Sequence, residues 1–290
     1  MSLDVLATGT EIATRAVTAL FVPGDRPERF AKAAAAGPDV VIIDLEDAVA
    51  PAAKEAALSA ALAALAATDD EDTRLRALVR VNPIDSPRHS AERAALLALA
   101  QTSGHGLLGI MVPKAEDPVR LHGLSADLPA GLALIPLVES ATGLVNALEL
   151  ARVSGVTRLA FGAIDFALDI DAGDSDRFLD HARSQLVVAS RAAGIAAPWD
   201  SPTTDIKDTV KVAGSASLGR GFGFGGKLCI HPAQLGAVHE AFAPTAEEVE
   251  WAHSVIGAEG GAAQVDGQMI DRPVTERAKR ILVRAGAEQS

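Results

Sequence analysis

The fold of the chain is decided by residues 40–67, which read VVIIDLEDAVAPAAKEAALSAALAALAA. The continuous apolar run at residues 40–44 is typical of a strand that is buried on both faces of a sheet. Pro51 suits the first turn of a helix, and leucines then recur at helical spacing on one stripe through residues 52–67. This stretch therefore predicts one βα unit, with an acidic turn between the strand and the helix.

The same alternation of short apolar runs and Ala- and Leu-rich segments recurs along the chain. Eight strands are expected, at residues 17–22, 40–44, 77–81, 107–112, 132–138, 157–162, 195–198 and 227–230. Eight such units predict an α/β fold of the (β/α)₈ TIM-barrel type. A doubly wound open sheet is the alternative, but no G-x-G-x-x-G pattern follows the first strand to support its dinucleotide-binding form.

The pattern divides the chain into three segments. We expect an N-terminal tail at residues 1–16, the barrel at 17–243 and a C-terminal helical extension at 244–290. The extension should hold a helix, a Gly- and Ala-rich connector and a last helix, at 245–256, 257–267 and 274–285. Because a barrel does not need this extension to close, we interpret it as a lid or as an arm that contacts another subunit.

The composition excludes several classes of protein. The 290 residues include 26 Lys and Arg against 38 Asp and Glu, so a net charge of −12 argues against nucleic acid or an anionic membrane as partner. Aromatic residues make up only 3%, too few for a surface that stacks bases. The single cysteine, Cys229, leaves no internal disulfide framework. With neither a membrane-length apolar run nor a signal-peptide pattern, we expect a cytoplasmic protein.

Charged residues gather where the predicted strands end. In barrel enzymes, the side chains at the carboxyl ends of the strands face the substrate. The residues expected there are Glu46 and Asp47 after the second strand, Arg80 in the third, Glu139 after the fifth and Asp165 after the sixth. Four acids and one arginine should therefore meet at one rim of the barrel.

Glu139 and Asp165 follow consecutive strands, whose axes are about 4.8 Å apart in a sheet. Two carboxylates in this position can share one hard cation, and oxygen ligands without a neighbouring Cys or His favour Mg²⁺. The alternative is that each acid only caps the helix that follows its strand. The pairing of the two acids with Arg80 on the same rim favours the metal site.

Arg80 lies within an apolar strand, where a guanidinium group is costly unless it is paired or binds an anion. It could form a structural ion pair with Glu46 or Asp47. It could also meet a substrate carboxylate or carbonyl while these acids hold its orientation, and the two roles are compatible. We therefore assign Arg80, Glu46 and Asp47 to the catalytic site.

Seven motifs of the sequence resemble one family, the citrate lyase β-subunit-like proteins of the HpcH/HpaI aldolase superfamily. They are FVPGDRP at 21–27, IDLEDAV at 43–49, VRVN at 79–82, PLVES at 136–140, FGAIDF at 161–166, GKLCIHP at 226–232 and GQMIDRP at 267–273. Malyl-CoA and citramalyl-CoA lyases are relatives within this superfamily. The resemblance runs in order along nearly the whole chain.

The resemblance implies a Mg²⁺-dependent TIM-barrel lyase, usually a homotrimer, that acts on acyl-CoA thioesters. By this resemblance Glu139 and Asp165 ligate Mg²⁺, and Arg80 contacts a small 2-oxo acid. The remaining residues that it implicates bind the acid or the CoA group: the backbone of Gly162 and Ala163 for the acid, and Phe21, Arg26 and Lys32 for CoA.

The expected reaction splits a 3-hydroxyacyl-CoA such as malyl-, citramalyl- or citryl-CoA into acetyl-CoA and a 2-oxo acid, or runs in reverse. Asp271 would exchange a proton with the acetyl carbon, as the resemblance implies, from the adjacent protomer. Its alternative role is the N-cap of the last helix. Three other functions remain open: a citrate lyase β subunit acting on a carrier-protein thioester, a malyl-CoA thioesterase, and a silent paralogue that only binds CoA.

Overall fold

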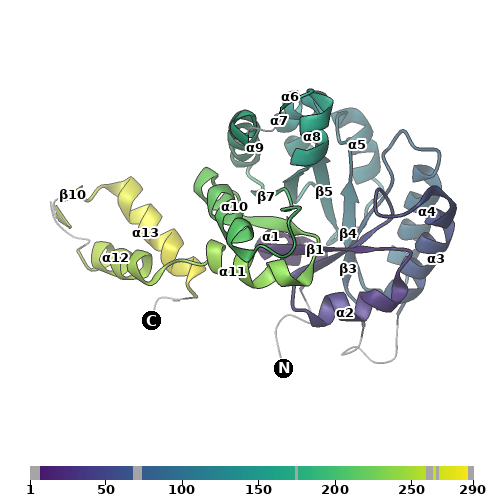
Figure 1. Cartoon of the computed structure of the whole chain (residues 1–290), viewed down its shortest axis with the longest axis horizontal. Coiled ribbons are helices and arrows are strands. Elements are labelled where there is room, and N and C mark those ends of the chain that lie inside the picture. The colour runs from purple at the N-terminus through teal and green to yellow at the C-terminus, as the bar shows by residue number, and fades with distance from the viewer. Residues whose placement is uncertain (1–6, 68–73, 174–175, 259–263, 266–267, 287–290) are drawn as a thin grey trace. The chain divides into compact units, whose positions relative to one another are not determined.

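The computed structural model describes residues 7–67, 74–173, 176–258, 264–265 and 268–286 (Figure 1). Parts of the connector predicted at 257–267, and Gly267 of the last motif, lie outside these residues. The chain separates into two compact units, Met1–Ala241 and Phe242–Ser290, which we describe one at a time.

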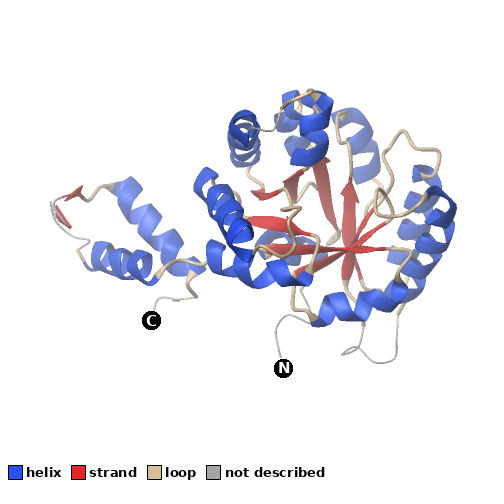
Figure 2. Cartoon of the chain, viewed as in Figure 1, coloured by secondary structure: helices blue, strands red, loops and turns tan. Residues whose placement is uncertain are grey.

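The first unit is a closed barrel of eight parallel strands. These are β1 Thr18–Pro23, β2 Val40–Asp44, β3 Ala77–Arg80, β4 Leu107–Val112, β5 Ala133–Val138, β6 Arg158–Phe161, β7 Ala196–Asp200 and β8 Gly226–Cys229. Each strand pairs with the next, and β1 pairs with β8 to close the ring. Figure 2 shows the strands inside a layer of helices. The predicted TIM barrel is therefore confirmed, with all eight expected strands in place.

One or two helices of this unit follow each strand, and α1 precedes β1. The helices are α1 Gly9–Arg15, α2 Phe30–Ala35, α3 Lys54–Leu65, α4 His89–Ala100, α5 Pro118–Ser125, α6 Ala141–Val145, α7 Ala147–Arg152, α8 Ala163–Asp169, α9 Leu179–Ala193, α10 Thr209–Phe222 and α11 Leu235–Phe242. In the βα unit at residues 40–67, a 3₁₀ turn at Pro51–Ala53 leads into α3. The proline occupies the first helical turn, as its fixed φ favours.

Burial explains why the apolar runs became strands. Every residue of β2, β4, β5 and β6 is buried, because side chains on one face fill the barrel and those on the other face meet the helices. The core includes Ile42, Leu78, Ile135 and Trp199, each at most 1% exposed. This packing fixes the carboxyl ends of the strands, which carry the acidic turns.

The segment at residues 1–16 contains a helix that the sequence analysis did not expect. Thr8 and Glu11 form a capping box at the start of α1. The amide of Thr10 donates to the carbonyl of Gly131 at 3.0 Å, directly before β5, and Ala13 is fully buried. This helix therefore packs on the amino-terminal side of the barrel as part of the same unit.

The second unit is built on two helices, α12 Ala246–Gly257 and α13 Arg272–Arg284, as the sequence predicted. Ala252 and Val255 of the first helix pack against Ala278 and Ile281 of the second. Gln264–Val265 and Gln268–Met269 form a two-stranded antiparallel sheet, β9 and β10. In the described ranges of the whole chain, no helix is long and apolar enough to span a membrane.

Candidate functional site

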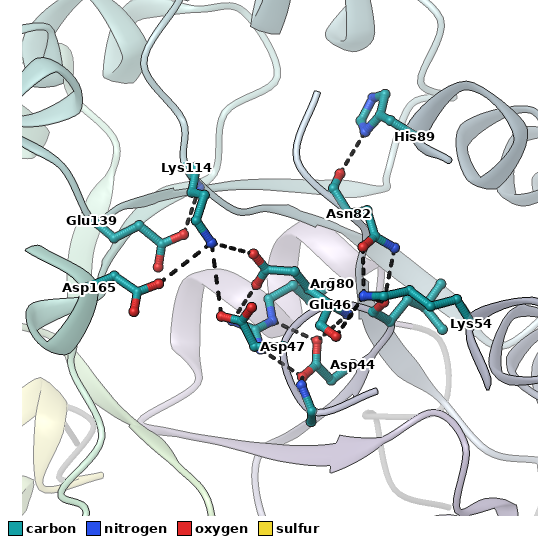
Figure 3. Close-up of polar contacts among 12 residues, drawn as sticks. Asp44, Glu46, Asp47, Lys54, Arg80, Asn82, His89, Lys114, Glu139 and Asp165 are labelled. Carbon is teal, nitrogen blue, oxygen red and sulfur yellow. Dashed lines mark hydrogen bonds and ion pairs between the residues drawn. The ribbon is translucent and has the colours of Figure 1, made fainter. Parts of the chain in front are cut away.

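Charged side chains meet at the carboxyl ends of β2 to β6 (Figure 3). We call seven of them the rim cluster: Asp44, Glu46, Asp47, Arg80, Lys114, Glu139 and Asp165. All five residues that the sequence analysis expected at this rim belong to it. Five carboxylates share two cations, so the rim cluster carries an excess of negative charge.

Arg80 is the last residue of β3 and is held by two acids. Its Nε and one terminal nitrogen donate to the carboxylate of Asp44 at 2.7 and 2.6 Å, and the other terminal nitrogen lies 2.9 Å from Glu46. Burial alone would lower the pKa of Arg80, but Asp44 and Glu46 outweigh it and raise the pKa. The ring of Phe21 lies under the guanidinium group, and its centre is 4.8 Å from the guanidinium carbon of Arg80. Arg80 is therefore a permanent cation of fixed orientation.

The partners of Arg80 differ in part from the expected ones. The sequence analysis named Glu46 or Asp47, whereas the structure pairs Arg80 with Glu46 and Asp44. Because Asp44 is paired in register with Arg80 on the neighbouring strand, their side chains face each other directly. Asp47 lies further along the turn, where its side chain is 61% exposed and 3.9 Å from the Lys114 ammonium.

Lys114 is a member of the rim cluster that the sequence analysis missed. Its Nζ lies 2.6 Å from Glu46 and 3.6 Å from Asp165, and its backbone N–H donates to Glu139 at 2.7 Å. Burial acts to lower the pKa of Lys114, but Glu46 and the other acids raise it well above the usual value. The sequence did contain a signal for Lys114. It follows β4 by two residues, and the other members of the rim cluster also lie at strand ends or shortly after them.

Glu139 follows β5 directly, and its side chain is almost fully buried, with 4% of the residue exposed. Burial, followed by the negative charge of Glu46, raises the pKa of Glu139 to about 8, against the opposing effect of Lys114. Asp165 contributes further repulsion and lies one turn beyond the expected strand end, in the first turn of α8. A cation between these carboxylates would relieve their repulsion.

Glu139 and Asp165 line one cavity of about 490 Å³ together with Asp47 and Lys114. Gly162 makes room for the glutamate, because a Cβ at this position would lie 2.5 Å from Glu139 Oε2. Within the described ranges, no group of three or more acidic, His or Cys side chains is gathered to hold a metal alone. Two carboxylates whose other ligands are waters or substrate suit Mg²⁺, so the residues fit this ion.

The backbone proposed to face the 2-oxo acid lies between β6 and α8. The N–H of Ala163 donates to the hydroxyl of Ser201 at 3.0 Å. Ser201 follows β7, which extends to Asp200 and therefore beyond the predicted end at residue 198. A buried Lys227 in turn donates to the hydroxyl of Ser215 at 3.0 Å and lies 3.4 Å from Asp200. The residue pattern had not indicated this polar network.

A second buried network supports the acidic turn after β2. The ammonium of Lys54 donates to the carbonyls of Leu45 and Glu46, each at 2.8 Å, and to the side chain of Asn82 at 2.7 Å. The backbone N–H of Asn82 donates to the carboxylate of Glu92 at 2.7 Å. These bonds fix the turn that presents Glu46 to Arg80.

Three other residues that were expected in the site, Arg26, Lys32 and Asp271, do not belong to the rim cluster. Arg26 has a side chain that is 56% exposed beside Asp25, and Lys32 is exposed on α2. Asp271 accepts a hydrogen bond from the Val274 N–H at 3.1 Å, so it is the N-cap of α13. The capping role that the sequence left open is present, and it does not preclude another role for the same carboxylate.

Sequence comparison places this architecture among known proteins. The HpcH/HpaI aldolase/citrate lyase family matches residues 17–232. A citrate lyase subunit beta-like protein of Mycobacterium tuberculosis is 38% identical, over 93% of this chain and 96% of that protein. A (3S)-malyl-CoA thioesterase of Cereibacter sphaeroides is 33% identical, with 92% and 94% covered. The mitochondrial citramalyl-CoA lyase of Homo sapiens is 30% identical, with 92% and 84% covered.

Structure comparison agrees with the sequence matches. The crystal structure of protein CitE from Mycobacterium tuberculosis, in complex with magnesium, acetoacetate and coenzyme A, superimposes with a TM-score of 0.79. It is 35% identical, and the match covers 94% of this chain and 98% of that one. The fold and the order of the elements are therefore shared along almost the whole length of both chains.

Proposed function

The chain belongs to the HpcH/HpaI aldolase/citrate lyase family, and on that premise we propose that it is a Mg²⁺-dependent carbon–carbon lyase. Its substrate would be a 3-hydroxyacyl-CoA thioester, which it cleaves to acetyl-CoA and a 2-oxo acid or forms from them. The observation that carries the proposal is the pair of carboxylates, Glu139 and Asp165, lining one cavity beside a permanently charged Arg80. The magnesium-bound CitE structure supports it.

Glu139 and Asp165 would hold Mg²⁺, which when bound supplies Lewis-acid polarisation of the substrate oxygen. Arg80 would bind the part of the substrate that becomes the 2-oxo acid and stabilise the alkoxide that forms when its hydroxyl loses a proton, before the carbon–carbon bond breaks and the electron pair passes to the acetyl thioester. Asp44 and Glu46 keep the guanidinium in place, so little reorganisation accompanies that step. The backbone of Gly162 and Ala163 would lie against the same acid.

The CoA group and the proton-transfer step require residues outside the rim cluster. We assign the CoA moiety to Phe21, Arg26 and Lys32, which lie on β1 and in the α2 region. We assign proton exchange at the acetyl carbon to Asp271 of an adjacent protomer in a homo-oligomer, with a trimer as the expected assembly. A cytoplasmic location accords with a CoA substrate and a free, buried Cys229.

The thioesterase is a second candidate, because a (3S)-malyl-CoA thioesterase is 33% identical over most of the chain. The two activities leave different products. A lyase releases acetyl-CoA and a 2-oxo acid, whereas a thioesterase releases free CoA and an intact hydroxy acid. A citrate lyase β subunit would instead require a carrier-protein thioester.

The deciding experiment incubates the protein and Mg²⁺ with malyl-, citramalyl- or citryl-CoA and identifies the products by mass spectrometry. We expect acetyl-CoA with glyoxylate, pyruvate or oxaloacetate from one of the three. The Asp271→Asn variant, which can retain the cap, should reduce turnover and acetyl-CoA proton exchange by about 100-fold or more. Free CoA with an intact hydroxy acid, or no reaction with any of the three, would contradict the proposal.

A further inference from the structure

One lysine contacts both of the proposed metal ligands. The backbone N–H of Lys114 donates to Glu139 Oε1 at 2.7 Å, and its Nζ lies 3.6 Å from Asp165 Oδ2. The same Nζ lies 2.6 Å from Glu46 Oε1 and 3.9 Å from Asp47 Oδ2. Figure 3 shows this ammonium group among the carboxylates of the rim cluster.

The backbone of Lys114 is unusual in a way that serves these contacts. Its φ is +48°, in the left-handed region that residues other than glycine rarely adopt. Such a conformation is unfavourable on its own and persists where surrounding contacts fix it. Here it directs the amide to Glu139 and the side chain to Glu46 and Asp165 at the same time.

We propose that Lys114 is a tethered counter-cation of the metal site, which neutralises the carboxylates in the metal-free protein and opposes the binding of a divalent cation. The inference rests on the proposed function, because it assumes that Mg²⁺ binds Glu139 and Asp165. Like charges a few ångströms apart repel each other even in water, and more strongly where water is partly excluded. Lys114 therefore acts on Mg²⁺ through Asp165 and its neighbours, as a positioning residue.

A purely structural role for Lys114 predicts a different pattern. If the lysine only anchored Glu46, removing its charge would loosen the rim and weaken Mg²⁺ binding. If the lysine is a counter-cation, removing its charge destabilises the metal-free protein but strengthens Mg²⁺ binding. The two roles therefore predict opposite signs for the change in affinity.

The test measures Mg²⁺ binding without substrate, by isothermal titration calorimetry, and thermal unfolding with and without Mg²⁺. Lys114→Met keeps most of the side-chain length and places the same demand on the backbone, but it removes the charge. We expect its dissociation constant for Mg²⁺ to fall at least about fivefold, and its metal-free unfolding midpoint to fall by about 2–4 °C. Lys114→Arg keeps the charge and should bind Mg²⁺ within about threefold of wild type.

Lys211→Met is the matched control, because Lys211 is 66% exposed and pairs with Asp205 and Asp208 instead of the rim cluster. It should leave Mg²⁺ affinity unchanged. An unchanged or weaker Mg²⁺ affinity in Lys114→Met, with normal binding by wild type, would overturn the inference and leave the metal site standing. Absence of Mg²⁺ binding by the wild-type protein would overturn the metal site and the inference together.

Discussion

The two ends of the barrel differ in how the charges of their buried side chains are compensated. At the amino end, Arg158 opens β6 and is only 1% exposed. Its guanidinium donates to the carbonyls of Ala13 and Ala16 at 2.8 and 2.7 Å and to that of Ala197 at 2.9 Å, and it lies 4.4 Å from the Trp199 ring centre. At the carboxyl end, the rim cluster gathers five carboxylates and two cations beside a cavity.

Under the proposed function, the difference separates a structural charge from a functional one. Burial lowers the pKa of Arg158 to about 9, so it stays charged at neutral pH, and carbonyls from its own chain satisfy it. Glu139, in contrast, has its pKa raised to about 8 because burial and like charges disfavour the carboxylate. Carbonyls of the chain therefore compensate the charge at the amino end, whereas a cation bound as we propose would relieve the repulsion at the carboxyl end.

The largest expected effect separates activity from stability at the carboxyl end. Glu139→Gln should lower kcat/KM at least about 1,000-fold, or about 4 kcal/mol, because a proposed metal ligand is lost. The amide oxygen can still accept the Lys114 N–H, so urea unfolding should show no loss of stability. A folded Glu139→Gln protein with activity near that of wild type would contradict the functional role proposed for the carboxyl end.

The second-largest effect is expected at the amino end, where a substitution should reduce stability and leave Mg²⁺ binding unchanged. Arg158→Met should cost roughly 3 kcal/mol of stability, because buried carbonyls of Ala13 and Ala16 lose their donor. Urea unfolding measures this loss, and Mg²⁺ titration of the folded variant should give the wild-type affinity. A stable variant with altered Mg²⁺ binding would assign Arg158 to the functional site.

The sequence predicts the features of these two regions that depend on neighbouring residues, and it does not predict those that depend on residues distant in the chain. Apolar runs and strand ends are local signals, so the barrel and the acids of the rim cluster were predictable. The contacts of Arg158 were not, because its partners Ala13 and Ala16 lie more than 140 positions away in the chain. The strand predicted at 195–198 ended before Asp200 and Ser201, so neither residue was expected in the site. The pairing of Arg80 with Asp44 depends on strand register, which residue spacing alone does not give.

A smaller effect is expected at Arg80. Arg80→Lys keeps a positive charge but loses the planar group that two acids hold, so kcat/KM should fall about 100-fold. Because Asp44 and Glu46 would be left partly unpaired, stability should fall as well, which distinguishes this site from Glu139. Steady-state kinetics with the preferred thioester measures the loss. Near-full activity would return Arg80 to a structural role like that of Arg158.

The smallest expected effect is a pH dependence in the metal-free protein. The pKa of Glu139 is about 8 in the folded state, against an ordinary value of 4.5. Between these values the folded protein binds more protons than the unfolded chain, so stability should fall as pH rises from about 5 to 8. The contribution of Glu139 to this slope stays below the one-proton limit of about 1.4 kcal/mol per pH unit.

Glu139→Gln supplies the control for this dependence, because the amide does not titrate. Urea unfolding at several pH values should show a flatter profile for the variant than for wild type. Glu46 retains part of the slope in both proteins, since burial also raises its pKa. Identical profiles for wild type and variant would contradict the role of Glu139.

The central claim is that the carboxyl end of the barrel binds a divalent cation between Glu139 and Asp165. It is tested most directly by anomalous diffraction from crystals soaked in Mn²⁺, which prefers oxygen ligands as Mg²⁺ does. The account predicts one strong peak about 2.1 Å from a carboxylate oxygen of each residue, and no such peak in Glu139→Gln crystals. A peak elsewhere on the protein, or none at a saturating Mn²⁺ concentration, would contradict it.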